Sequence, residues 1–171
     1  MKLVELCQPI RLLLCDVDGV MTSGQVILDN QGIETKQFNI RDGLGIMLWK
    51  KADLDFGIIT GRSSQSVRLR ATELSIDIVR QGIQHKLKTA EELVEQLKLT
   101  PDQVAYIGDD LPDLPVIRWA GLGVAVADAA DEVKAGANHQ TAACGGQGAV
   151  RELIETILKA QQRWEELIQH Y

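Results

Sequence analysis

The sequence lacks the features of disulfide-bonded, zinc-binding or membrane-spanning proteins. Among 171 residues it has three cysteines, Cys7, Cys15 and Cys144, too few and too scattered for a disulfide framework, and none of them forms a C-x-x-C pair. The start of the chain contains apolar residues, but Asp16 and Asp18 end that run far below the ~18 residues that span a bilayer. No small-residue cleavage site is evident there. We therefore expect a cytoplasmic protein with reduced thiols and no membrane partner.

A concentrated positive charge is also missing. The chain has 18 Lys and Arg against 24 Asp and Glu, a formal net charge of −6, and the basic residues are scattered along it. Nucleic-acid-binding domains carry a basic patch or stripe, so no nucleic-acid partner is expected. With 45% hydrophobic residues, the length suits one globular domain over residues 1–171.

Short apolar runs alternate with helix-like segments along the chain. The first run, residues 11–15, ends in acidic and glycine residues, which is typical of a strand buried on both faces that opens into a loop. Strands alternating with helices predict βαβ units, and therefore an α/β fold with a mainly parallel sheet flanked by helices. The other predicted strands are residues 56–59, 76–79, 104–107 and 123–126, and the predicted helices are about 44–54, 64–74, 86–98 and 111–120.

Two segments depart from this alternation. Residues 25–28 and 35–39 flank a turn-forming group at 29–32, which predicts a β-hairpin inserted after the first strand, over about residues 25–39. A lone hairpin is marginally stable in water, so it must pack on something. After the glycine-rich residues 145–148, apolar side chains at helical spacing predict a final helix and tail over about 149–171.

Acidic residues follow two of the predicted strands. Asp16 and Asp18 come directly after the first strand and share one side, because successive strand side chains alternate between faces. Asp109 belongs to a second acidic cluster, residues 108–113, after another strand. Ligands of open α/β sheets bind outside the carboxyl ends of the strands, and close carboxylates repel unless a cation or a shared proton compensates them. Oxygen ligands of this kind predict a Mg²⁺ site.

Groups that can hold phosphate lie between the two acidic clusters. Thr60 and Arg62 follow the second strand, and Lys86 follows the loop at 82–85. A hydroxyl can donate to a phosphate oxygen, and an ammonium supplies a compact positive charge. Each residue alone is a weak indication, since Asp is common at turns and helix caps. The inference depends on all four groups in the order Asp-x-Asp, Thr, Lys, Gly-Asp-Asp-x-x-Asp, each after a predicted strand.

This motif order resembles the haloacid dehalogenase (HAD) superfamily of phosphohydrolases, which have a Rossmann-like fold. The resemblance implies that Asp16 attacks phosphorus, that Asp18 protonates the leaving oxygen and later activates water, and that Thr60 and Lys86 hold the transferring phosphoryl group. It also implies a Mg²⁺ site made by Asp16, Asp109 and the backbone carbonyl of Asp18. The intervals between the motifs hold only the hairpin with one helix, and one helix with one strand, so we expect no cap domain.

Four longer segments, residues 16–22, 38–46, 60–62 and 145–152, resemble the 3-deoxy-D-manno-octulosonate 8-phosphate (KDO 8-P) phosphatases, and the similarity runs over nearly the whole chain. The resemblance implies a small phosphorylated sugar acid as substrate, on the route to lipopolysaccharide. It also implies a homotetramer with hairpins at its centre and each site completed by the adjacent subunit. Arginines near the site would pair with the substrate carboxylate. The implied substrate contacts are Asp18, Asn39, Arg41, Asp42, Gly43, Arg62, Arg70 and Lys86.

Other interpretations stay open or are disfavoured on particular grounds. A nonulosonate 9-phosphate substrate stays open, because eight and nine carbons differ by only a few kcal/mol of pocket contacts. A non-catalytic tetrameric binding module is disfavoured by the intact catalytic motifs. A signalling receiver domain would need a phosphoacceptor Asp after the third strand, where the chain has residues 79–81, Val-Arg-Gln. Phosphotransferases and mutases usually need a cap to exclude water.

Overall fold

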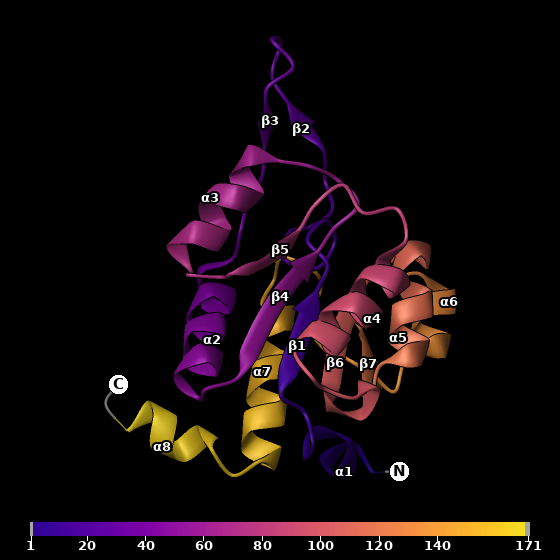
Figure 1. Cartoon of the computed structure of the whole chain (residues 1–171). Helices are drawn as coiled ribbons and strands as arrows, with labels where there is room; N and C mark the ends of the chain where they lie inside the picture. Colours follow the sequence, from indigo (N-terminus) through magenta and orange to yellow (C-terminus); the bar gives the residue numbers. More distant parts are fainter. Residues whose placement is uncertain (1, 170–171) are drawn as a thin grey trace.

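A central parallel sheet organises the fold. The computed structural model describes residues 2–169, and within them six strands lie in the order β5-β4-β1-β6-β7-β8 (Figure 1). Every neighbouring pair is parallel, which confirms the predicted α/β class. The strands are β1 (Leu12–Cys15), β4 (Asp55–Ile59), β5 (Ile78–Arg80), β6 (Val104–Gly108), β7 (Leu122–Ala125) and β8 (His139–Gln140).

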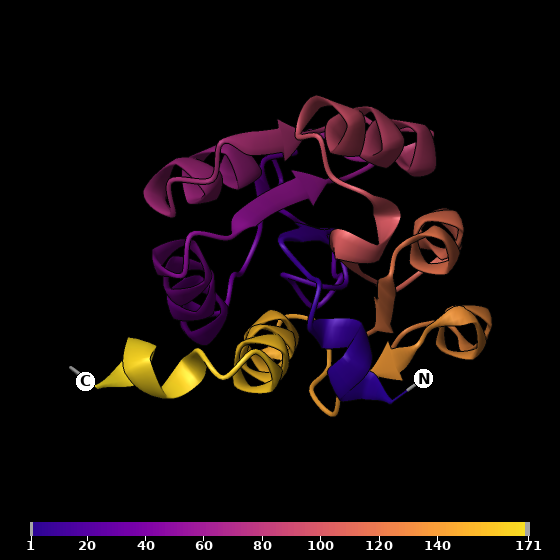
Figure 2. The same ribbon diagram turned by 60° about the horizontal axis from the view of Figure 1, so that its bottom comes forward.

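Helices cover both faces of this sheet (Figure 2). On one face α2 (Ile40–Lys51) packs against α7 (Ala149–Ala160), and on the other α4 (Lys86–Gln96) packs against α5 (Leu114–Trp119). The helix α3 (Gln65–Glu73) joins β4 to β5. The remaining helical segments are α1 (Leu3–Cys7), α6 (Asp131–Gly136), α8 (Trp164–Ile168) and the 3₁₀ turns η1 (Pro101–Gln103) and η2 (Leu111–Asp113).

The core explains why β1 is apolar throughout. Leu12, Leu13 and Leu14 are all fully buried, because helices cover both sides of the strand and leave no solvent-facing position. Burying each leucine contributes about 1.5–3 kcal/mol relative to an exposed side chain. The predicted final helix is also confirmed as α7, whose apolar stripe is buried against the sheet and α2 at Val150, Leu153, Ile154, Ile157 and Leu158.

The predicted hairpin is present and stands beyond the carboxyl ends of the sheet strands (Figure 1). Its strands β2 (Ile27–Leu28) and β3 (Glu34–Thr35) pair antiparallel. Asp29 closes the turn, because its Oδ1 accepts from the backbone N–H groups of Gln31 and Ile33, each at 2.8 Å. Three apolar side chains at the hairpin are more than half exposed, at 57% for Val26, 59% for Leu28 and 58% for Ile33.

Several elements differ from the sequence prediction. Helices α1 and α6 and strand β8 were not expected, and α2 begins at Ile40 rather than near residue 44, because Asn39 caps it by accepting from the Arg41 N–H at 2.8 Å. The predicted tail forms a separate short helix, α8, after Gln162 takes a positive φ of 58°. Between Asp18 and Lys86 the chain forms the hairpin, α2, β4, α3 and β5, so the expected absence of a cap domain in this interval is confirmed. Within residues 2–169, no helix has the length and apolar character needed to cross a bilayer.

Candidate active site

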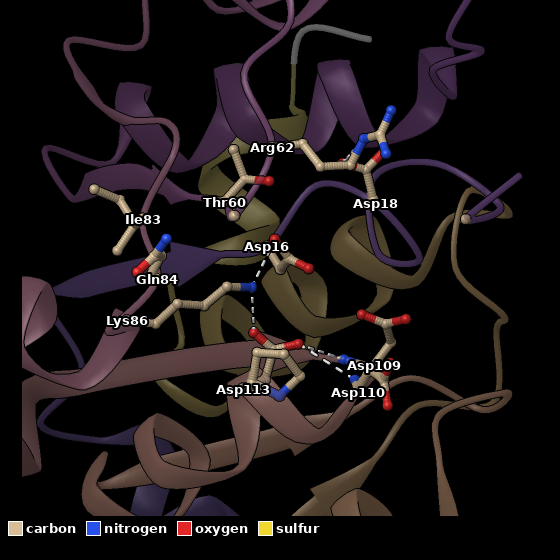
Figure 3. Close-up of a pocket in the computed structure, with 13 residues that line it drawn as sticks. Asp16, Asp18, Thr60, Arg62, Ile83, Gln84, Lys86, Asp109, Asp110 and Asp113 are labelled. Carbon is tan, nitrogen blue, oxygen red and sulfur yellow. Dashed lines mark hydrogen bonds and ion pairs between the residues drawn. The ribbon is translucent and has the colours of Figure 1, made fainter. Parts of the chain in front are cut away.

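A cavity of about 540 Å³ opens at the carboxyl ends of β1, β4 and β6 (Figure 3). These strands are adjacent in the sheet, so the residues that follow them meet at one edge although they are far apart in the sequence. The structure therefore brings together the residues of all four motifs. The lining residues are Asp16, Asp18, Gly24, Thr60, Gly61, Arg62, Ile83, Gln84, Lys86, Asp109, Asp110, Pro112 and Asp113.

Lys86 bridges two buried carboxylates at the base of this cavity. Its Nζ lies 2.9 Å from Asp16 Oδ1 and 2.6 Å from Asp113 Oδ1. Burial lowers the pKa of Lys86, but the neighbouring Asp113 and Asp16 carboxylates outweigh that effect and raise it overall. The ammonium therefore stays charged, with only 4% of its side chain exposed.

Asp113 fixes this arrangement from beneath. It is 1% exposed, and its Oδ1 accepts from the Tyr106 hydroxyl at 2.6 Å as well as from Lys86. Its Oδ2 accepts from the backbone N–H groups of Asp109 at 3.0 Å and Asp110 at 3.3 Å. Asp113 thus ties the loop after β6 to the lysine that contacts Asp16.

Three carboxylates converge at a point that suits a divalent cation. One oxygen from each of Asp16, Asp109 and Asp113 lies within 4.8 Å of the others. Burial, followed by the nearby Asp113, raises the pKa of Asp16 to about 6, and burial with Asp113 and Asp16 raises that of Asp109 to about 8. When all three carboxylates are deprotonated, their charge and that of the Lys86 ammonium sum to −2, which a divalent cation would balance. The donor set therefore fits Mg²⁺.

Glycine lets the two acidic loops approach each other. Gly19 has a positive φ of 93°, and a Cβ built on it would lie 2.0 Å from Asp109 Oδ2. A Cβ on Gly145 would lie 1.8 Å from the Gly19 carbonyl oxygen, and the Gly146 N–H donates to the Val20 carbonyl at 2.9 Å. The glycine-rich turn at 145–148 therefore packs directly behind the loop that carries Asp16 and Asp18.

Asp18 lies among charges of both signs at the mouth of the cavity. Its Oδ1 is ion-paired with the Lys36 ammonium, and its Oδ2 lies 4.0 Å from Arg62 Nε. Glu34, next to these groups, accepts from the Arg62 guanidinium and lies 3.6 Å from Lys36 Nζ. Burial raises the pKa of Glu34, but Arg62 and Lys36 outweigh it and lower that pKa overall. Thr60, 1% exposed, also lines the cavity, and Figure 3 shows it beside Arg62.

Five of the predicted substrate contacts lie elsewhere in the chain. Asp42 is 2% exposed and accepts from the Arg151 N–H at 2.8 Å, at the start of α7, and burial raises its pKa to about 6. Arg70 donates to the Asn39 carbonyl at 3.3 Å and lies so close to α2 that a Cβ on Gly43 would be 2.4 Å from its Nη2. Among the described residues, these five do not line the cavity, and their role stays a prediction. They are Asn39, Arg41, Asp42, Gly43 and Arg70.

Sequence reasoning assigned no individual role to four residues that shape the site. Asp113 belongs to the motif at 108–113, so its spacing from Asp109 could have identified it. Tyr106 lies two residues before Gly108 on a strand, which places both on one face, but this spacing is common. Glu34 and Lys36 lie in the hairpin, whose position over the site no local pattern indicates.

Comparisons with known proteins agree with this geometry. A family described as haloacid dehalogenase-like hydrolase matches residues 68–153. The 3-deoxy-D-manno-octulosonate 8-phosphate phosphatase of Yersinia pestis is 49% identical over 156 residues, which cover 91% of this chain and 83% of the relative. The Escherichia coli K12 enzyme of the same name is 45% identical over 157 residues, covering 92% and 84%.

A solved relative extends the agreement to three dimensions. The crystal structure of the Moraxella catarrhalis 3-deoxy-D-manno-octulosonate 8-phosphate phosphatase, in complex with magnesium ion, phosphate ion and KDO, superposes with a TM-score of 0.95 at 42% identity. The match covers 96% of this chain and 95% of that one. Sequence, fold and strand-end motifs agree, so the chain belongs to the 3-deoxy-D-manno-octulosonate 8-phosphate phosphatase family of haloacid dehalogenase-like hydrolases.

Proposed function

We propose that this chain is a Mg²⁺-dependent phosphatase that hydrolyses 3-deoxy-D-manno-octulosonate 8-phosphate to the free sugar acid and inorganic phosphate, in lipopolysaccharide biosynthesis. The observation that carries the proposal is the Asp16 carboxylate, held by Lys86 at 2.9 Å within a three-carboxylate cluster at the base of the cavity. A carboxylate in this place can attack phosphorus, because the adjacent ammonium offsets charge on the phosphoryl oxygens.

Hydrolysis proceeds in two displacements. An Asp16 oxygen forms a bond to phosphorus, the bond from phosphorus to the sugar oxygen breaks, and Asp18 gives its proton to that oxygen. A water oxygen then forms a bond to phosphorus while Asp18 takes a proton from the water, and the bond from Asp16 to phosphorus breaks to release phosphate. Thr60 and Lys86 hold the phosphoryl oxygens in both steps. Dividing one difficult displacement into two easier ones is the advantage of a covalent nucleophile.

The carboxylates of Asp16, Asp109 and Asp113, with the backbone carbonyl of Asp18, would hold the Mg²⁺ ion. The convergence of the three carboxylate oxygens within 4.8 Å supports the first three of these ligands. When bound, the ion offsets negative charge on the transferring phosphoryl group and on Asp16, which eases the approach of two anions.

The substrate assignment follows the relatives, which are 3-deoxy-D-manno-octulosonate 8-phosphate phosphatases. The Moraxella catarrhalis relative has KDO in its crystal structure. Arg62, 51% exposed at the cavity mouth, can pair with a substrate carboxylate. The test is phosphate release from the eight-carbon acid phosphate, a nine-carbon acid phosphate and a hexose phosphate at equal concentration. Preference for the nine-carbon acid would move the assignment to sialic-acid-type metabolism, and the absence of release from all three would refute a phosphatase.

The nucleophile has its own test. The Asp16→Asn protein should fold and lose turnover, because the amide keeps the shape but cannot attack phosphorus. A matched control is Asp77→Asn, whose side chain is 95% exposed and remote from the cavity, and which should retain activity. Retained phosphatase activity in Asp16→Asn would refute the mechanism.

We further propose that residues 1–171 form one domain and that the protein is a homotetramer with active sites shared between subunits. The exposed Val26, Leu28 and Ile33 at the hairpin support this, since apolar side chains gathered on a projecting hairpin favour contact with another copy. Mixing inactive Asp16→Asn subunits with Arg41→Ala subunits tests the sharing. Hybrids should regain activity if Arg41 completes a neighbour's site, and should stay inactive if each subunit is self-sufficient.

A further inference from the structure

Lys36 lies where the hairpin meets the active site. It comes directly after β3, and its side chain is only 2% exposed. The ammonium contacts Asp18 Oδ1 and lies 3.6 Å from Glu34 Oε1. Lysine side chains are seldom buried to this extent unless acidic groups pair with them. Here Asp18 and Glu34 are those acidic groups.

The other oxygen of Asp18 has different surroundings. Asp18 Oδ2 is buried yet has no hydrogen-bond partner among residues 2–169, and Arg62 Nε stays 4.0 Å away. In Figure 3 the Asp18 carboxylate lies next to the Arg62 guanidinium rather than beside the Asp16 and Lys86 pair. One oxygen is thus held by Lys36, and the other is buried without a hydrogen-bond partner.

Lys36 itself is placed to act through Asp18 rather than on a ligand. Among the described residues, it does not line the cavity, whereas Asp18 and Arg62 do. Glu34 lies within reach of both cations, pairing with Arg62 and standing 3.6 Å from Lys36. The hairpin therefore holds Asp18 by a network that does not need a ligand to form.

We propose that Lys36 is a positioning residue for Asp18. Its ammonium occupies Oδ1 and fixes the rotation of the carboxyl group, so that proton exchange with the leaving oxygen and then with water takes place at Oδ2. This inference rests on the proposed function, because it assigns Asp18 the proton transfers given above. It also means that the hairpin sets the geometry of the acid in its own subunit.

The test compares how strongly the reaction depends on its leaving group. A series of substituted phenyl phosphates is used with the purified full chain and Mg²⁺, and log(kcat/KM) is plotted against the pKa of the released phenol. A well-placed acid contributes about 10²–10⁴-fold, mostly for poor leaving groups. In Lys36→Met we expect kcat/KM to fall about 100-fold for the poorest leaving group and about threefold or less for p-nitrophenyl phosphate.

Two matched variants separate positioning from damage to the fold. Lys36→Arg keeps a cation for Asp18 and should recover most of the leaving-group dependence of the wild type. Lys88→Met removes a lysine whose side chain is 77% exposed and should leave the slope unchanged. Thermal unfolding shows whether Lys36→Met folds. If that variant does not fold, Lys36→Gln takes its place, and the same slope of log(kcat/KM) against the pKa of the leaving group is expected for it.

The outcomes distinguish this inference from the function on which it rests. A wild-type protein that hydrolyses no phosphate ester overturns both. An active wild type with equal losses across the whole series in Lys36→Met leaves the phosphatase assignment intact and overturns the role of Lys36. A steeper slope in Lys36→Met, with recovery in Lys36→Arg, is the result that supports it.

Discussion

Mg²⁺ binding to this site should release protons, and its affinity should rise with pH. Burial and the neighbouring Asp113 and Asp16 carboxylates raise the pKa of Asp109 to about 8. A carboxylic acid must lose its proton before it can ligate a cation, so the proton and the metal compete for Asp109.

The size of the effect follows from that pKa. At pH 7 a group with a pKa of about 8 is protonated in roughly ten of eleven molecules, so apparent Mg²⁺ affinity is about tenfold below its limit, or about 1.4 kcal/mol. At pH 6 the loss is roughly a hundredfold. Asp16, with a pKa of about 6, adds a smaller loss in the same direction.

The raised pKa of Asp109 also makes the stability of the metal-free protein depend on pH. The pKa of Asp109 in the folded state lies above the ordinary value of about 3.9, so between about pH 4 and 8 the folded protein binds more protons than the unfolded chain. The contribution of this group to the free energy of unfolding therefore falls as pH rises through that window. Saturating Mg²⁺ should remove the decline, because the ion replaces the proton.

Titration calorimetry in two buffers of different ionisation enthalpy measures the proton count directly. About one proton should be released per Mg²⁺ at pH 7, and less than half of one at pH 9. Asp109→Asn should abolish both binding and release. Asp110→Asn is the control, since its amide oxygen can still accept the Leu111 N–H that Asp110 accepts at 2.8 Å. A Mg²⁺ affinity that stays flat from pH 6 to 8 would refute this account of Asp109.

Three further perturbations test other parts of the structure. Lys86→Met should lower kcat by about 10²-fold or more, because it removes the ammonium that faces Asp16, and steady-state phosphate release measures it; near-normal turnover would contradict that role. Gly145→Ala should lower the free energy of unfolding by about 1–3 kcal/mol, because its Cβ would lie 1.8 Å from the Gly19 oxygen. The comparison in urea titrations is Gly61→Ala, whose Cβ would meet only the Ile83 carbonyl oxygen, at 3.6 Å. The double variant Leu28→Lys with Ile33→Lys should dissociate the proposed oligomer in light scattering while the monomer stays folded, and an unchanged mass would argue against the hairpin as an interface.

Much of the fold could be predicted because burial on both faces has a clear sequence pattern. The run at Leu12 to Cys15 is apolar throughout, and the stripe on α7 repeats at helical spacing, so β1 and the start of α7 were placed within a residue or two, whereas α7 ends earlier than predicted, at Ala160. The elements that were not predicted are short. Strand β8 has two residues, His139 and Gln140, and α6 has six, so neither offers enough positions for a period to show.

The residues of the site also divide into those that the sequence predicts and those that it does not. The order of motifs placed Asp16, Thr60, Lys86 and Asp109 at one cavity, because parallel strands deliver their following residues to the same sheet edge. Lys36 follows no such rule. Its distance from Asp18 is set by how the hairpin folds back over the loop after β1, which is a tertiary property that neither spacing nor composition records.

The proposed assembly and the predicted substrate contacts depend on one another. Asp42 is buried at the start of α7, and Arg70 is engaged by Glu73 at 2.8 Å and by the Asn39 carbonyl, so in one subunit both serve the junction of α2, α3 and α7. Among residues 2–169 neither lines the cavity of its own chain. Direct contact with the substrate therefore requires that the hairpins bring this junction to a neighbour's cavity. A protein held monomeric by hairpin substitutions should keep the Asp16 chemistry on small aryl phosphates and lose its preference for the sugar acid.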